Sequence, residues 1–356
     1  MVGEKLLLYI HIPYCDSKCH YCSFNSYVDK FDTRKEYMIS LHKQLKYELK
    51  RFNVKNKEIE TIFIGGGTPS TVDPKLYEPI FELLKPFIKN NAEITTEANP
   101  NSATKEWLQG MYDLGLNRIS FGVQSFDQKK LKALNRAHSP QEAKVAVLAA
   151  KKIGFKNLSL DLIYNYQGDT ETLLKSDIEQ AFKLPINHIS AYELTIESGT
   201  KFASTPKVRQ EDDELAFFVA KEIEAKGFKH YEISNFGTYQ STHNKGYWEV
   251  KDYMGVGAGA VGFLKDTRYY PTADIDLYIK EPLLIKEEPL RADELLTERL
   301  FLGLRSNVGV NENILDEAMK KRADFLVEKE KLFKEVNIYK NSNYFISDEL
   351  VLYILG

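Results

Sequence analysis

About the first 200 residues of the chain alternate between short β-rich runs and longer segments of helical periodicity. We expect strands at Leu6–Ile12 and at residues 60–64, 93–97, 118–122, 158–163 and 188–194. Behind the first strand, one apolar helical stripe is formed by Tyr37, Leu41, Leu45, Leu49 and Phe52. Such alternation predicts a parallel sheet with covering helices. Six repeats, where a closed barrel has eight, predict an incomplete (βα)6 TIM-like barrel that is open on one side.

Beyond about residue 200 this alternation ends. We expect a helix at 212–226 and a glycine- and aromatic-rich sheet extension or loop region at 237–270. The charged, proline-containing passage 280–289 predicts a linker, residues 292–305 a helix and residues 339–355 a small β element. The chain is therefore expected to divide into a barrel core at 1–200, an extension at 201–285 and a small α+β module at 286–356.

Charge and cysteine content restrict the partners and the compartment. The 48 Lys and Arg residues are balanced by 51 Asp and Glu residues, so bulk charge gives no reason to expect a nucleic-acid partner. The N-terminal apolar run is too short for a secretory signal, and no stretch approaches the roughly 20 apolar residues of a membrane span. Three cysteines cannot form a disulfide framework, so we expect the protein in the reducing cytoplasm. Peripheral contact with a membrane stays possible.

All three cysteines, Cys15, Cys19 and Cys22, follow the first strand in a CxxxCxxC loop. Thiolates are soft ligands that suit iron–sulfur clusters, zinc or copper(I). Three ligands for a cubane leave one iron open to a small molecule, and this arrangement is favoured by the spacing. A structural zinc site would need a fourth ligand such as His11, His20 or a remote group. Inert or disulfide-bonded cysteines are the third alternative.

Polar and glycine residues follow the other predicted strands. Functional groups of parallel barrels lie where strands end and loops begin. We therefore expect the cysteine loop to lie close to four other groups at the strand ends: residues 65–69 (Gly-Gly-Gly-Thr-Pro), Glu97, Gln124 and Asp161. A glycine triplet lets the backbone approach a ligand closely. Taken alone, it would more often mark a tight turn.

The CxxxCxxC loop resembles that of the radical S-adenosylmethionine (SAM) superfamily. The run Tyr-Ile-His-Ile-Pro-Tyr-Cys resembles its HemN/HemW branch, which contains oxygen-independent coproporphyrinogen III oxidases and haem chaperones, and the resemblance covers nearly the whole chain. It implies a [4Fe–4S] cluster whose open iron is chelated by SAM, with a reductant such as flavodoxin or ferredoxin. In that chemistry one electron cleaves SAM to methionine and a 5′-deoxyadenosyl radical. For residues 286–356 it implies a HemN-type module.

The resemblance also implies a set of SAM-binding residues. They are Tyr9, Gly66, Gly67, Thr68, Glu97, Gln124, Arg136 and Asp161. Arginine pairs with a carboxylate through its planar fork, while carboxylates accept from hydroxyl or ammonium groups. Taken singly, each polar residue would more often be a solvated or capping residue, and Tyr9 a core residue. The sequence identifies no residue that acts on a substrate.

Two features bear on the choice between oxidase and chaperone. The oxidases extend the motif to CxxxCxxCxC, whereas this chain has Phe24 at the last position. Residues 243–248 form an HNxxYW pattern that resembles the haem-associated signature of the chaperones, through His243, Asn244, Tyr247 and Trp248. Imidazole is a good haem ligand, and aromatic rings offer flat apolar surface. Alternatively, His243 is a satisfied loop histidine and the two aromatic residues belong to the core.

We therefore expect a haem chaperone of the radical SAM superfamily that delivers haem to respiratory haemoproteins. The alternative is an oxygen-independent coproporphyrinogen III oxidase that decarboxylates two propionates to give protoporphyrinogen IX. A structural zinc protein is the third possibility. The glycine-rich residues 255–262 are too irregular for a dinucleotide fingerprint, so we expect them to serve close backbone packing.

Overall fold

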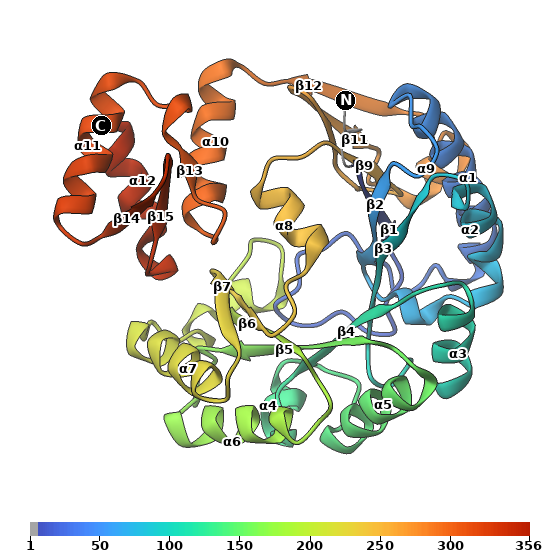
Figure 1. The fold of residues 1–356 in the computed structure, drawn as a ribbon. Coiled ribbons are helices and arrows are strands. Elements are labelled where there is room, and N and C mark those ends of the chain that lie inside the picture. The colour runs from blue at the N-terminus through green and yellow to red at the C-terminus, as the bar shows by residue number, and fades with distance from the viewer. Residues whose placement is uncertain (1–5) are drawn as a thin grey trace.

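The computed structural model describes residues 6–356 and is built around six parallel strands that curve into an open barrel (Figure 1). These strands are β1 (Leu6–Ile12), β2 (Ile59–Gly66), β3 (Ile88–Ala98), β4 (Arg118–Gln124), β5 (Asn157–Tyr164) and β6 (His188–Glu193). Each pairs in parallel with the next along the chain. The predicted strands and the incomplete (βα)6 barrel are confirmed.

Helices cover the outer face of the sheet (Figure 1). They are α1 (Arg34–Arg51), α2 (Glu78–Leu84), α3 (Lys105–Asp113), α4 (Gln128–Ala133), α5 (Pro140–Ile153), α6 (Glu171–Phe182) and α7 (Asp213–Ala225). The predicted stripe of α1 is buried in the main core from Tyr37 to Leu49, and Phe52 packs against that core. At α5 the side chains of Ser139 and Glu142 form a capping box, which fixes where the helix begins.

Side chains alternate along the barrel strands between two environments. One set, which includes Ile62, Ile94 and Leu160, joins the apolar core between sheet and helices. The other set, which includes Thr61 and Arg118, is polar and nevertheless buried. Successive side chains of a strand point to opposite faces, so the polar set occupies the interior of the barrel. A ligand cavity at the strand ends therefore lies over a polar interior.

Further strands widen the sheet at both edges. β9 (Tyr253–Val256) runs parallel to β1, and three antiparallel strands follow it in the order β10 (Gly262–Leu264), β11 (Thr267–Pro271) and β12 (Ile285–Pro289). At the other edge, β8 (Asn235–Gly237) and β7 (Lys229–Glu232) follow β6. The predicted helix at 212–226 is confirmed. Within 237–270 the sheet extension is confirmed from residue 253 onward, whereas residues 242–248 form a helix.

The prediction of a linker at 280–289 is wrong. The backbone of β12 pairs with that of β11 from Thr267 opposite Pro289 to Pro271 opposite Ile285. Charged side chains are tolerated on an edge strand because they remain in solvent, and the middle of β12 is exposed. The segment between β11 and β12 contains α9 (Ile275–Lys280).

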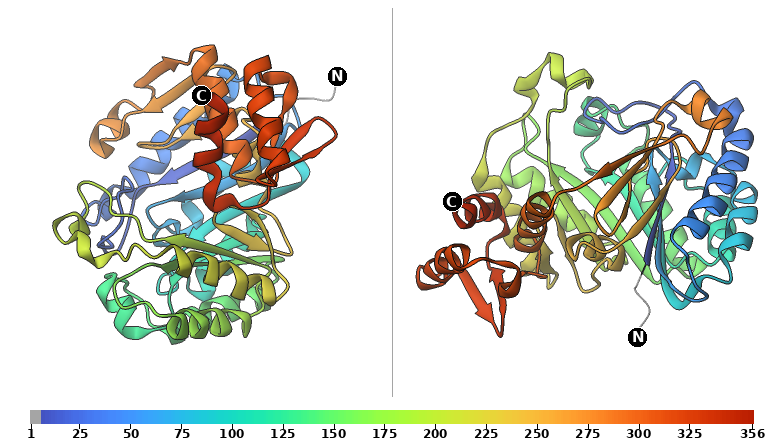
Figure 2. Two further views of the ribbon diagram at one scale, coloured as in Figure 1. Left: turned by 90° about the vertical axis from the view of Figure 1, so that its left-hand side faces the viewer. Right: turned by 90° about the horizontal axis from the view of Figure 1, so that it is seen from above.

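The C-terminal module has its own apolar core and stands to one side of the barrel (Figures 1 and 2). It contains α10 (Ala292–Leu304), α11 (Glu317–Glu328), α12 (Ser347–Leu355) and a sheet of β13 (Val310–Asn311), β15 (Ile338–Asn341) and β14 (Leu332–Glu335). The predicted helix at 292–305 is confirmed. The predicted β element at 339–355 is wrong beyond β15, because Leu350, Val351 and Ile354 recur at helical spacing and bury one face of α12.

Helix α8 (Thr242–Trp248) carries the HNxxYW residues and contacts both β2 and α10. Its first turn receives the buried carboxylate of Glu93, which accepts hydrogen bonds from the backbone N–H groups of Thr242 (2.8 Å) and His243 (3.0 Å). A negative charge at a helix N-terminus is favourable.

No helix within residues 6–356 is long and apolar enough to cross a bilayer. The domain limits at residues 200 and 285 stay predictions.

Candidate functional site

A cavity of about 360 Å³ lies at the carboxyl ends of the barrel strands. Most of the residues predicted for the cluster and for SAM line it together: Cys15, Cys19, Cys22, Gly66, Gly67, Thr68, Glu97, Gln124, Arg136 and Asp161. We call it the cluster cavity. The convergence predicted for the strand ends and the cysteine loop is thus present.

The cysteine loop is fastened to the end of β2. The backbone N–H of Gly67 donates to the carbonyl of Ile12 (2.8 Å), and that of Thr68 donates to the carbonyl of Tyr14 (2.6 Å). The Cys15 thiol lies 3.3 Å from the Thr68 hydroxyl. The loop therefore starts from a rigid support, which suits a ligand-holding segment.

The glycine triplet makes this contact sterically feasible. A Cβ on Gly67 would lie 2.7 Å from the carbonyl oxygen of Tyr14, and one on Gly66 would lie 2.5 Å from the ring of His11. Gly66 also has a φ of 109°, a left-handed conformation that favours glycine. The sequence predicts that the glycine triplet contacts a ligand. The structure adds a second role, because the triplet also packs against the start of the cysteine loop.

Arg136 joins the cysteines to the strand ends. Its guanidinium donates to the Cys19 thiol (3.2 Å), to the Asn99 side-chain oxygen (2.5 Å) and to the Gly122 carbonyl (2.6 Å). Burial opposes its charge, yet neighbouring Tyr21 and Cys19 raise the pKa of Arg136 above its ordinary value. The guanidinium is therefore a fixed cation beside the cysteines. Its buried Nε–H has no partner.

The carboxyl groups of Glu97 and Asp161 are among those that line the same cavity. Burial, and then the charge of Asp161, raise the pKa of Glu97 to about 8. Burial likewise raises the pKa of Asp161, against the hydrogen bond donated by Ser120 at 3.0 Å. Glu97 also accepts from the backbone N–H of Gly66 at 3.2 Å. Neighbouring carboxyls resist joint ionisation because their negative charges repel. A cationic ligand beside them would relieve this repulsion, so this part of the cavity favours one.

Gln124 and Asn99 complete the polar lining. The β4–β5 register shifts between Phe121 and Gln124, and Gln124 has a φ of 68°. Non-glycine residues in this region are uncommon and mark constrained sites. Asn99 was missed as a site residue although it lies only two positions after Glu97. It bridges Arg136 and the Thr68 hydroxyl, to which its amide donates at 3.2 Å.

The donor set fits the two expected groups. Three thiols reach one cavity, and burial raises the pKa of Cys15 and of Cys22, so metal would displace protons from them. An unpartnered guanidinium N–H suits a carboxylate, and two carboxyls suit an ammonium or sulfonium group. Within residues 6–356, no three His, Cys, Asp or Glu side chains are grouped to hold a single metal ion. The three thiols expected to hold a cubane would each bind a different iron, so they need not be grouped around one point.

The remaining predicted residues lie outside the cluster cavity. Tyr9, expected at the SAM site, lines a second, adjoining cavity of about 620 Å³ together with Tyr247. His243 is fully buried, and Asn244 and Trp248 are partly buried. The ring nitrogens of His243 lie 2.7 Å from the Thr61 hydroxyl and 2.9 Å from that of Tyr247. The predicted HNxxYW residues thus lie on helix α8, and none of them lines the cluster cavity.

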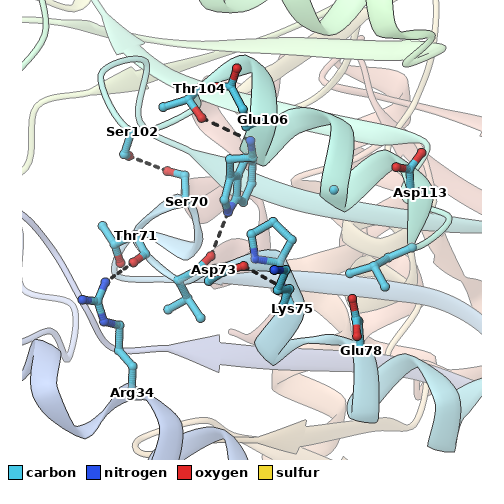
Figure 3. A pocket seen from close by; sticks show the side chains of 15 residues that line it. Arg34, Ser70, Thr71, Asp73, Lys75, Glu78, Ser102, Thr104, Glu106 and Asp113 are labelled. Atoms are coloured by element: carbon cyan, nitrogen blue, oxygen red, sulfur yellow. Dashed lines mark hydrogen bonds between the residues drawn. The ribbon is translucent and has the colours of Figure 1, made fainter.

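A third, open hollow of about 830 Å³ lies between the turns after β2 and helix α3 (Figure 3). Its polar groups largely bond to one another: Ser70 and Ser102 are 2.6 Å apart, and Arg34 donates to the Thr71 carbonyl. Glu106 and Asp113 on its rim are exposed. We assign this hollow no function.

Known proteins resemble the chain in sequence and in fold. The model of the radical SAM superfamily matches residues 9–181. The haem chaperone HemW of Bacillus subtilis (strain 168) is 33% identical over 324 residues, 85% of this chain and 84% of that protein. HemW of Escherichia coli (strain K12) is 38% identical over 265 residues, 72% of this chain and 70% of that protein.

The solved structure of Escherichia coli coproporphyrinogen III oxidase (HemN), described as a radical SAM enzyme, superposes with a TM-score of 0.81. It is 17% identical, and the match covers 99% of this chain and 90% of that chain, which shows a shared fold. The 33% and 38% sequence identity with the two HemW proteins is a stronger indicator of kinship than the 17% identity with this oxidase. The chain belongs to the HemW family within the radical SAM superfamily.

Proposed function

We propose that this protein is a haem chaperone that binds a [4Fe–4S] cluster, SAM and haem and delivers haem to respiratory haemoproteins. The observation that carries the proposal is the cluster cavity, where three thiols, the Arg136 guanidinium and the carboxyls of Glu97 and Asp161 meet. Kinship with proteins named haem chaperones supports the choice of cargo.

In this proposal Cys15, Cys19 and Cys22 hold the cluster. The Nε–H of Arg136 is available to the SAM carboxylate, and Glu97 and Asp161 to its cationic and hydroxyl groups. When bound, the reduced cluster and SAM supply radical chemistry. The chain's own groups orient SAM, and the seat formed by Gly66 and Gly67 keeps the cysteine loop in place.

Phe24 argues against the oxidase alternative. It occupies the position of the fourth oxidase-type cysteine, its side chain is 63% exposed, and it borders the cluster cavity. A phenyl ring offers no metal ligand and no acid or base. The alternative is retained as an outcome of the experiment, since the fold resembles that of HemN.

The experiment uses full-length protein reconstituted with iron and sulfide under anaerobic conditions. Iron, sulfide and zinc are quantified, SAM binding is measured by calorimetry, and haem is titrated by absorbance. A parallel reaction supplies coproporphyrinogen III, SAM and a reductant and measures loss of propionate groups. Haem binding without decarboxylation supports the proposal. Formation of protoporphyrinogen IX would establish the oxidase, and stoichiometric zinc with little iron would refute the cluster.

The partners and compartment belong to the same proposal. A flavodoxin or ferredoxin would supply the electron, and the protein would work in the cytoplasm with peripheral contact to the membrane that holds the respiratory chain. Transfer of haem from the loaded protein to membrane vesicles carrying apo-haemoproteins tests this step. Haem that leaves at the same rate with and without the vesicles would contradict it.

A further inference from the structure

The second cavity adjoins the cluster cavity, and the two share wall residues Ser23, Phe24, Gly66 and Glu97. Its volume of about 620 Å³ is within the range of small-molecule and cofactor sites. Aromatic rings from four elements and from the cysteine loop line much of it, beside polar groups that include Glu97, Lys251 and Glu298. We call it the aromatic cavity, with walls formed by Tyr9, Phe24, Tyr247, Tyr253 and Phe263.

Ring contacts hold this wall in place. The ring centroids of Tyr247 and Tyr253 are 4.8 Å apart and edge to face, and those of Tyr253 and Phe263 are 6.1 Å apart. Phe263 is almost fully buried. Aromatic pairs at such distances stabilise one another beyond their burial. The cavity therefore offers a preformed wall rich in aromatic rings, with polar groups such as Glu97 and Lys251 beside them.

His243 supports this wall from behind. Its ring stacks on Phe63 at 5.1 Å and meets the Tyr247 ring edge-on at 4.8 Å. Both ring nitrogens lie within hydrogen-bond distance of a hydroxyl, Nδ1 at 2.7 Å from Thr61 and Nε2 at 2.9 Å from Tyr247. The imidazole is wholly buried and does not line the aromatic cavity. Only Tyr247 reaches from this pair to the cavity.

Resting on the haem-binding function proposed above, we propose that the aromatic cavity receives the porphyrin macrocycle and that His243 is a positioning residue for Tyr247, not the axial ligand of the haem iron. An axial imidazole must present a free nitrogen lone pair to the iron. His243 would have to break a hydrogen bond and leave the barrel interior to do so. Tyr247 needs no such movement to contact a macrocycle.

The location is tested by filling the cavity. Val261 lines the aromatic cavity, and Val261→Trp adds a ring there, while Val145→Trp makes the same change at an exposed position of α5. In reconstituted full-length protein, Val261→Trp should weaken haem binding about tenfold or more, with iron content and SAM affinity unchanged. Val145→Trp should change none of these. Wild-type haem affinity in Val261→Trp would overturn the location. Absence of haem binding by the wild type would instead overturn the proposed function.

The role of His243 is tested by comparing variants that remove the same hydrogen bond from either side. His243→Ala and Tyr247→Phe should each weaken haem binding about five- to tenfold. His243→Gln, whose amide can still bond to Tyr247, should restore most of the affinity. The resonance Raman and absorbance signatures of the axial ligand should stay the same in all three. A ligand change confined to the two His243 variants, with Tyr247→Phe unaffected, would overturn the positioning role.

Discussion

Proton release from Glu97 should make SAM binding strongly dependent on pH. In the ligand-free protein, burial and Asp161 raise the pKa of Glu97 to about 8, so the group is mostly protonated at neutral pH. A cation of SAM placed beside it favours the carboxylate. Binding should therefore expel a proton below about pH 8, and the affinity should rise with pH until the free group is ionised.

The magnitude follows from the ionised fraction of free Glu97. With a pKa of about 8, this fraction rises from about 0.03 at pH ~6.5 to about 0.76 at pH ~8.5. The affinity for SAM should increase about 25-fold over that interval, which corresponds to roughly 2 kcal/mol. Glu97→Gln, which keeps the shape but cannot ionise, should lose this part of the dependence.

Calorimetry of the reconstituted protein in two buffers of different ionisation enthalpy measures both the affinity and the protons exchanged. The α-amino group of SAM titrates near the same pH, so the decisive quantity is the difference between wild type and Glu97→Gln. We expect close to one additional proton released by the wild type near neutral pH. Equal pH slopes and equal proton release in the two proteins would refute the reasoning.

Further predictions concern the other site residues. Replacing Cys15, Cys19 or Cys22 singly by alanine should remove most iron and sulfide, measured after anaerobic reconstitution; retention of a full cluster would refute that ligand. Arg136→Ala should weaken SAM binding about tenfold or more, since a charge-assisted hydrogen bond contributes roughly 1.5–3 kcal/mol; unchanged affinity would remove Arg136 from the site. Gly66→Ala should lower the melting temperature and the cluster content more than Gly168→Ala, because both glycines have positive φ but only Gly66 would bring a Cβ against His11; equal effects would contradict the steric argument. SAM-free protein should lose stability as pH rises from about 4.5 to about 8, because folded Glu97 holds its proton more tightly than the unfolded chain; chemical denaturation of Glu97→Gln, which should lack this loss, provides the check.

The barrel could be predicted because its signals are local. The strands are short β-rich runs, and the helices between them have helical periodicity, as α1 does from Tyr37 to Leu49. The position of the cluster cavity could also be predicted, because parallel strands bring their carboxyl ends to one edge. Asn99 was overlooked because an asparagine before proline is also typical of turns, and only its contacts with Arg136 and Thr68 distinguish it.

Edge and terminal segments were harder to predict. The charges of β12 resemble those of a linker, because an edge strand with solvent on one side needs no apolar alternation. The aromatic cavity has no local pattern at all. Its wall combines Tyr9 of β1, Tyr247 of α8, Tyr253 of β9 and Phe263 of β10, which only the folded sheet brings together.

The spacing of the HNxxYW residues along the sequence could also have predicted a helix at this position. His243 and Tyr247 are four positions apart, so in a helix they face the same side and contact each other. Ser241, whose hydroxyl accepts from the backbone N–H of Asn244, is a helix-starting residue that the sequence already displays. An interpretation as helix α8, in place of a loop, pairs the imidazole with the phenol before any ligand is considered. In the proposed haem site, Tyr247 faces the cargo and His243 holds this tyrosine in place.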